Sequence, residues 1–160
     1  MSRISGSSLL ATAIGSLAVL LAAENPPKDF QDIMKSNGAI IDITLGIEAV
    51  SPNEQSADAH KPTSLRTHMR ARDYDGVAAD AAILKANFMK VEAFWTQRKV
   101  EDAMNFSKAA VKLAGDLEAA AKAKDDARIS ASASAIANTC RACHQEHRIM
   151  QLTDKSFQIM

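Results

Sequence analysis

The chain has 160 residues, its 19 Lys and Arg are balanced by 19 Asp and Glu, and aromatic residues make up only 4% of it. This length fits one domain, and the absence of a basic excess argues against a nucleic-acid partner. Alanine is abundant after residue 77, while Gly and Pro are few. The composition therefore favours long helices over a sheet.

The N-terminus carries the features of an export signal. An apolar run, LLATAIGSLAVLLAA, covers residues 9–23, and Arg3 is the only charge before residue 24. A run of this length that ends in small residues is typical of a secretory signal peptide. We therefore predict a signal peptide over residues 1–23 and a functional domain over residues 24–160, located in the periplasm. If it is not cleaved, the uncharged stretch 4–23 is long enough to anchor the chain in a membrane.

The first helix of the domain is predicted directly after a pair of prolines. Pro27 suits the beginning of a helix, and the chain can continue helically from Lys28 to about Val50. The polar segment 51–64 contains two prolines and no apolar period, so it is predicted to be a loop. A short helix is predicted over LRTHMRARD, residues 65–73.

Three further segments carry apolar residues at alternating spacings of three and four, which is the seam of an amphipathic helix. The seams are Val77, Ala81, Leu84, Phe88, Val91 and Trp95; Ala103, Phe106, Ala110, Leu113, Leu117 and Ala120; and Ile129, Ala133, Ile136, Cys140, Cys143 and His147. The connections near Lys99 and at residues 123–126 are short, which favours antiparallel neighbours. The predicted fold is all-α, an antiparallel four-helix bundle.

Both cysteines of the chain lie in one motif, NTCRACHQEHR, at residues 138–148 near the end of the last predicted helix. Cys140, Cys143 and His144 share a helical face within one turn. Two thiols at this spacing can form thioethers with the vinyl groups of haem, while the adjacent imidazole reaches the iron from the same side. C-x-x-C-H is the attachment signature of c-type haem, so we predict one covalent haem c with its iron.

Three haem-free alternatives would use the same cysteines: a redox CxxC pair, a zinc site and a structural disulfide. A redox CxxC is expected at a helix N-terminus in a βαβ setting, whereas this motif comes late in a helix. A zinc site needs further ligands at set spacings, and only His147 is close in sequence. A disulfide within one helical turn is geometrically poor. A haem-free helical protein that uses CxxC for thiol redox or zinc is the alternative from a different class.

The position of the motif makes the chain resemble the class II cytochromes c, the cytochrome c-prime group, which carry CxxCH near the end of the fourth helix of an exported bundle. The resemblance covers roughly residues 27–150 and is strongest over FMKVEAFW and TCRACHQEHR. It implies that His144 is the proximal ligand of the iron. It further implies that Arg148 pairs with a haem propionate, and it allows a homodimer through the first two helices.

The first helix governs the sixth coordination position of the iron in that family. The sequence FQDIMKSNG, residues 30–38, is similar to the pattern R-Q-x-L-M-K-x-x-G of the methionine-ligated branch, which implies Met34 as the sixth ligand. Phe30 stands where that pattern has arginine. On a helix, Met34 shares one stripe with Phe30, Gly38 and Ile41. The other candidates for this ligand are Met69, Met89, Met104, His60 and His68.

The sixth ligand decides the expected function. A thioether raises the reduction potential of haem, and a closed six-coordinate iron suits electron transfer and hinders gas binding. We therefore expect an electron carrier with redox partner proteins and no enzymatic activity of its own. A membrane would be involved only through an uncleaved N-terminal segment. The runner-up function is a five-coordinate, gas-binding haem protein of the same fold.

Several further residues receive a structural interpretation. The aromatic residues Phe88, Phe94, Trp95 and Phe106 could line a haem pocket, but core packing is the preferred interpretation. His147 is expected to be a structural hydrogen-bonding residue. The tail after residue 150 shows no recognisable chemistry.

Overall fold

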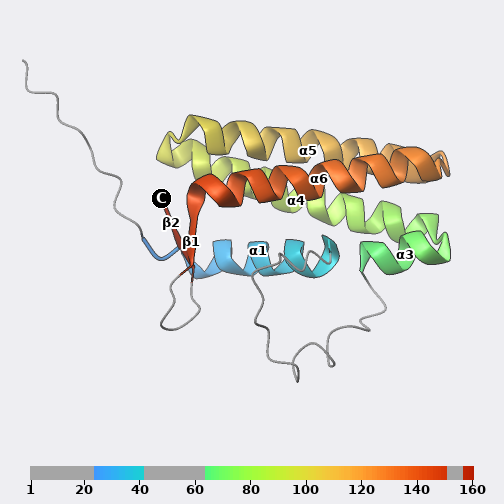
Figure 1. The fold of residues 1–160 in the computed structure, drawn as a ribbon, viewed down its shortest axis with the longest axis horizontal. Coiled ribbons are helices and arrows are strands. Elements are labelled where there is room, and N and C mark those ends of the chain that lie inside the picture. Colours follow the sequence, from blue (N-terminus) through green and yellow to red (C-terminus); the bar gives the residue numbers. More distant parts are fainter. Residues whose placement is uncertain (1–23, 42–63, 151–156) are drawn as a thin grey trace, which may run out of the picture.

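The structure is a computed structural model that describes residues 24–41, 64–150 and 157–160. Its helices are α1 (Lys28–Ile41), α3 (Leu65–Ala71), α4 (Tyr74–Arg98), α5 (Glu101–Lys122) and α6 (Asp126–His147), and its strands are β1 (Arg148–Met150) and β2 (Phe157–Ile159). The long helices follow the long axis of the molecule (Figure 1). The described residues are mostly helical, which confirms the predicted all-α class.

The short helix and the two tight connections predicted from the sequence are confirmed as α3, as the link between α4 and α5, and as the link between α5 and α6. Asp73 and Asp125 cap α4 and α6, because each carboxylate accepts a hydrogen bond from a backbone N–H of the first turn at 3.0 Å. Lys99, at φ 58°, ends α4 in the left-handed conformation.

Three sequence predictions fall outside the described residues: the signal peptide, the continuation of the first helix beyond Ile41, and the loop up to residue 63. Within the described ranges, no helix is both long enough and apolar enough to cross a membrane.

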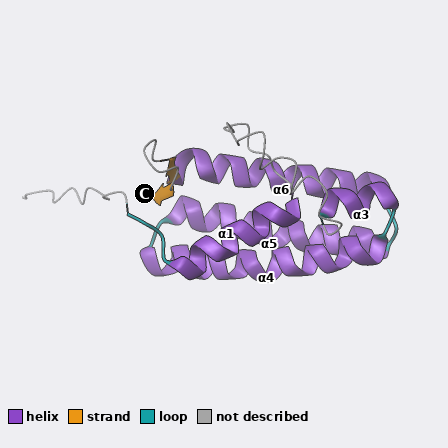
Figure 2. Ribbon diagram, turned by 90° about the horizontal axis from the view of Figure 1, so that it is seen from below, coloured by secondary structure: helices purple, strands orange, loops and turns teal. Residues whose placement is uncertain are grey.

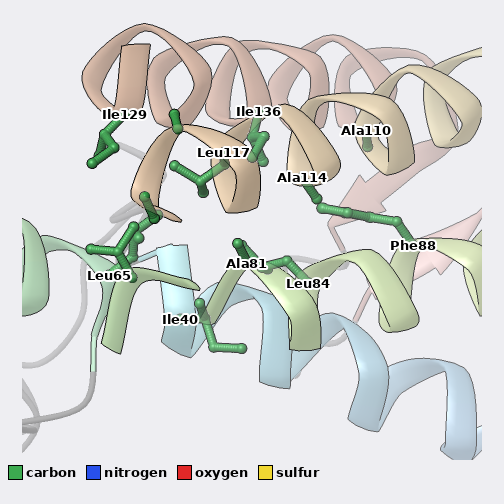
Figure 3. Close-up of a cluster of buried hydrophobic side chains, with 13 residues drawn as sticks. Ile40, Leu65, Ala81, Leu84, Phe88, Ala110, Ala114, Leu117, Ile129 and Ile136 are labelled. Atoms are coloured by element: carbon green, nitrogen blue, oxygen red, sulfur yellow. The ribbon is translucent and has the colours of Figure 1, made fainter. Parts of the chain in front are cut away.

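The main core lies where α5 packs against α4 on one side and against α6 on the other (Figure 3). The whole predicted seam of α4 is buried. Leu84, Leu117 and Ile136 are fully buried at its centre, so one leucine or isoleucine from each of the three helices fills the space between them. Burial of such a side chain stabilises the fold by about 1.5–3 kcal/mol.

The predicted seam of α5 needs a correction. Phe106 and Leu113 are only half-buried, whereas Ser107 and Ala114, each one position further along, are buried. The reason is that α5 contacts two helices, so its buried face is wider than a single seam and is lined by small side chains. The Ser107 hydroxyl is satisfied within the helix, since it donates to the carbonyl of Ala103 at 2.8 Å.

Helix α1 is attached to α4 through an aromatic cluster. Phe30 stacks on Phe94 with ring centroids 3.9 Å apart and meets the edge of Trp95 at 6.0 Å. Helix α1 contacts α4, and Figure 2 shows the C-terminal strand near the end of α6. Phe30 therefore anchors α1 by apolar contact.

Both ends of the described chain meet at one end of the molecule. β1 and β2 pair antiparallel, with Arg148 opposite Ile159. Glu24 extends this pairing, because its backbone N–H and C=O exchange hydrogen bonds with Ile159 at 3.0 and 2.9 Å. Arg98 holds the same glutamate by its side chain, with Nη2 2.8 Å from Oε1. The segment 157–160 is thus a fixed part of the fold.

Candidate functional site

A cavity of about 310 Å³ lies between α1 and α6 and is closed at one end by β2. Helix α4 forms its floor through Phe88 and Trp95. The remaining lining residues are Pro26, Phe30, Gln31, Met34, Lys35, Asn37, Gly38 and Ile41 from the first segment and Cys140, Cys143, His144, His147, Arg148, Phe157 and Ile159 from the last. The five residues predicted to hold the haem, which are Met34, Cys140, Cys143, His144 and Arg148, therefore all line one cavity.

Cys140, Cys143 and His144 project into this cavity from the last two turns of α6. Both cysteines are half-buried and neither forms a disulfide. Burial raises the pKa of the Cys140 thiol to about 12, and the nearby Cys143 adds to the rise. Burial also raises the pKa of Cys143 to about 11, with a smaller contribution from the charge of Asp102. The folded chain therefore holds two protonated thiols, whereas a thiol-redox site holds a reactive thiolate.

We expect these thiols to react slowly in the folded, haem-free chain. At pH 8 the pKa values of about 12 and 11 leave only about 1 in 10⁴ and 1 in 10³ of the groups as thiolate, against roughly a quarter in an unfolded chain. Residues 24–160, produced without export, should be alkylated by iodoacetamide at least about a hundredfold faster in urea than in buffer. Mass spectrometry over time measures both rates. Equal rates at pH 8 would contradict the burial of the cysteines.

His144 is poised as a neutral imidazole. Burial lowers its pKa to about 4, and the adjacent Arg148 guanidinium contributes to the lowering. Arg148 Nη1 lies 3.4 Å from His144 Nδ1, and because a guanidinium can only donate, Nδ1 is the acceptor and the ring proton is on Nε2. A neutral imidazole is the form that binds metals.

Arg148 follows α6 directly and is held against the C-terminal strand. Its guanidinium lies 3.2 Å from the ring centroid of Phe157, a cation–π contact. Burial lowers the pKa of Arg148, yet arginine stays charged in proteins. Arg148 thus places a cation at this end of the cavity, where it can pair with a carboxylate.

Met34 lines the wall opposite the cysteines, on α1. It shares that wall with Phe30, Gly38 and Ile41, as the predicted stripe requires. A Cβ built on Gly38 would have no heavy atom within 4 Å, so open space lies beside this turn of α1.

The other described candidates for a sixth ligand lie elsewhere. Met69 packs on the main core and Met104 on the cluster around Trp95, and neither lines the cavity. Met89 is 55% exposed. His68 is engaged by Asp80, with Nδ1 2.8 Å from Oδ2. His60 lies outside the described residues.

His147 has the structural role expected of it. It is buried, its Nε2 lies 3.0 Å from Asp102 Oδ2, and its Nδ1 lies 3.3 Å from the main-chain oxygen of Met160. Its ring is 5.3 Å from the ring of Trp95. His147 therefore ties α5 and the chain end to α6 at the closed end of the cavity.

Of the four aromatic residues considered for the pocket, Phe88 and Trp95 line the cavity and also belong to the core. Phe94 instead supports Phe30 from outside the cavity, and Phe106 does not reach it. Phe88 and Trp95 thus have both of the proposed roles, because they pack in the core and also line the pocket.

Two buried donors in the described structure have no hydrogen-bond partner, namely Asn37 Nδ2 and Trp95 Nε1, and both residues line this cavity. A buried unsatisfied donor costs about 1–3 kcal/mol. A ligand with acceptor atoms could satisfy these donors, and the two thiols, the neutral imidazole and the thioether beside them fit a large, mainly apolar group that holds iron, as haem does. Among the described residues, no three His, Cys, Asp or Glu side chains are grouped as a metal site would require.

Sequence reasoning missed two parts of this site. It assigned no role to the tail, although Phe157 and Ile159 form the end wall, and it did not consider Asn37. The alternation of apolar residues at 157 and 159 is a weak strand signal. Asn37 gives no signal, because a polar residue in a helix next to a glycine is ordinarily exposed.

No family model matches this chain, and neither does any of the curated proteins or solved structures with which it was compared.

Proposed function

We propose that the protein is a periplasmic monohaem cytochrome of the class II type, which carries electrons between redox partner proteins. In this proposal α1, α4, α5 and α6 form an antiparallel four-helix bundle with one haem c between α1 and α6. As a carrier, the protein would transform no substrate of its own. The residues before Glu24 would direct its export.

One observation carries the proposal: Cys140, Cys143 and His144 line the same cavity as Met34, from the opposite wall. Two protonated thiols on one helical turn suit attachment to two vinyl groups, and the neutral imidazole beside them suits iron. Bound there, haem would supply a one-electron Fe(III)/Fe(II) couple. Met34 would complete the coordination from α1, and its soft thioether would favour the ferrous form.

Arg148 would neutralise a haem propionate at the closed end of the cavity. In the haem-free chain its guanidinium contacts His144 Nδ1 at 3.4 Å. If His144 held iron through Nε2, its ring proton would be on Nδ1, which could not accept from arginine. Arg148 would be released from this contact and could pair with a carboxylate instead.

A five-coordinate, gas-binding haem protein of the same fold is the second candidate. The haem-free thiol-redox alternative has less support, because burial raises the pKa of both cysteines to about 11 or 12.

The test is the visible spectrum of the exported, purified protein, oxidised and reduced, with and without carbon monoxide. We expect a pyridine haemochrome of c type and low-spin spectra in both oxidation states, because Met34 would occupy the sixth position. Carbon monoxide should bind slowly, since it must displace sulfur. A high-spin ferric protein that binds carbon monoxide at once would favour the gas-binding candidate, and a colourless exported protein would refute both.

A further inference from the structure

Asn37 is the least expected residue in the cavity wall. Its side chain is only 4% exposed, it lines the cavity on α1, and its Nδ2 has no partner. An amide NH₂ group carries two donors, and burying them without an acceptor costs free energy. Such a donor in the wall of a cavity points to a ligand that brings an acceptor.

The orientation of this amide is fixed by a hydrogen bond from α4. Asn87, on α4, is itself nearly buried and donates from Nδ2 to Asn37 Oδ1 at 2.9 Å. The same Asn87 nitrogen lies 3.2 Å from the hydroxyl of Ser36. Because Asn37 Oδ1 is held by α4, the NH₂ group is the end of the amide that has no partner, in a residue that lines the cavity.

The position of Asn37 along the cavity limits what that acceptor can be. Asn37 is joined to Asn87, next to Phe88 in the main core, and Cys140 packs on the same core. The cationic Arg148 lies at the other end, against Phe157. In haem c the thioether-forming vinyl groups and the propionates lie on opposite edges of the ring. Attachment at the cysteines would therefore direct the propionates toward Arg148 and away from Asn37.

Asn37 would then meet the face of the haem on the α1 side. It follows Met34 by three residues, so both side chains lie on neighbouring positions of one helical face. The face of a porphyrin offers no hydrogen-bond acceptor of its own. An acceptor at this level must belong to whatever occupies the sixth position of the iron.

We propose that Asn37 is a hydrogen-bond donor to small axial ligands that carry acceptor atoms, such as a bound anion, and that it selects them over carbon monoxide. The inference rests on the proposed haem site. Thioether sulfur is only a weak acceptor, so Asn37 gains little while Met34 holds the iron. An anion that displaces Met34 satisfies the donor, whereas carbon monoxide, a much poorer acceptor, does not.

The test compares ligand affinities of the haem-loaded protein, with azide as the probe for the ferric form and carbon monoxide for the ferrous form. Asn37→Leu should weaken azide binding about fivefold or more, the worth of one hydrogen bond, and should change the affinity for carbon monoxide less than twofold. Asn105, which is exposed on α5, provides the matched control Asn105→Leu, which should change neither affinity.

A second measurement needs no variant and therefore does not depend on its folding. In the wild-type azide complex, the infrared stretching band of iron-bound azide should shift on transfer from H₂O to D₂O, because the donor N–H exchanges. Unchanged azide affinity in folded Asn37→Leu, or no isotope shift in the wild type, overturns the role of Asn37 while leaving the haem site intact. A wild-type protein without covalent haem instead overturns the proposed function itself.

Discussion

The double variant Cys140→Ala, Cys143→Ala is expected to lose all covalently bound haem. Both sulfur atoms line the cavity from one turn of α6, and the chain has no other cysteine with which to form a thioether. After acid–acetone extraction, the exported wild-type protein should keep its haem and the variant should release it. Haem staining of a denaturing gel gives the same answer independently.

A matched control lies on the same helix. Thr139 donates to the carbonyl of Ala135 at 2.9 Å and does not line the cavity, so Thr139→Ala should retain covalent haem at the wild-type level. The single variants should each keep one thioether and give a shifted pyridine haemochrome. Retention of covalent haem by the double variant would mean that the linkage is made elsewhere, and the site assignment would be wrong.

The parts of the fold that could be predicted are those in which the buried residues of a helix are apolar and regularly spaced. The seam of α4 from Val77 to Trp95 is buried throughout, because this helix packs on α5 along one face and on α1 along another, and its apolar residues serve both. The prediction was less accurate for α5. This helix contacts α4 and α6, and it buries Ser107 and Ala114 more fully than the predicted Phe106 and Leu113. Apolar spacing alone cannot indicate that a serine and an additional alanine are buried.

The part of the candidate site that lies within one short stretch of the sequence could be predicted. Cys140, Cys143 and His144 are neighbours on one helical turn, so their common orientation follows from spacing. Met34 was inferred from a resemblance, and the structure places it in the same cavity. That placement fits the proposed ligation, which stays a prediction.

The closed end of the cavity could not be predicted, because its contacts join distant parts of the chain. Glu24 pairs with Ile159, and His147 contacts both Asp102 and Met160. Strands of three residues leave almost no pattern in a sequence. The pair Asn37 and Asn87, fifty residues apart, is hidden for the same reason.

Replacing Met34 is expected to convert the haem-loaded protein from low-spin to high-spin in both oxidation states. Met34 is half-buried, packs beside the cluster of Phe30 and Trp95, and lines the wall opposite His144. In Met34→Ala the thioether is gone and α1 offers no substitute sulfur to the cavity. The ferric protein should lose the weak sulfur–iron charge-transfer band at the red end of its spectrum.

Carbon monoxide binding provides the quantitative measure of the same change. We assume that Met34 is detached from the iron in only about 1% of wild-type molecules. Its removal should then raise the apparent affinity for carbon monoxide about a hundredfold, because every molecule would have a free sixth position. Met104, which packs on the same cluster but does not line the cavity, supplies the control Met104→Ala, which should stay low-spin. A high-spin wild type, or a low-spin Met34→Ala variant, would exclude Met34 as the sixth ligand. The first outcome would favour an open, gas-binding iron, and the second would require another residue to reach the iron when α1 supplies no thioether.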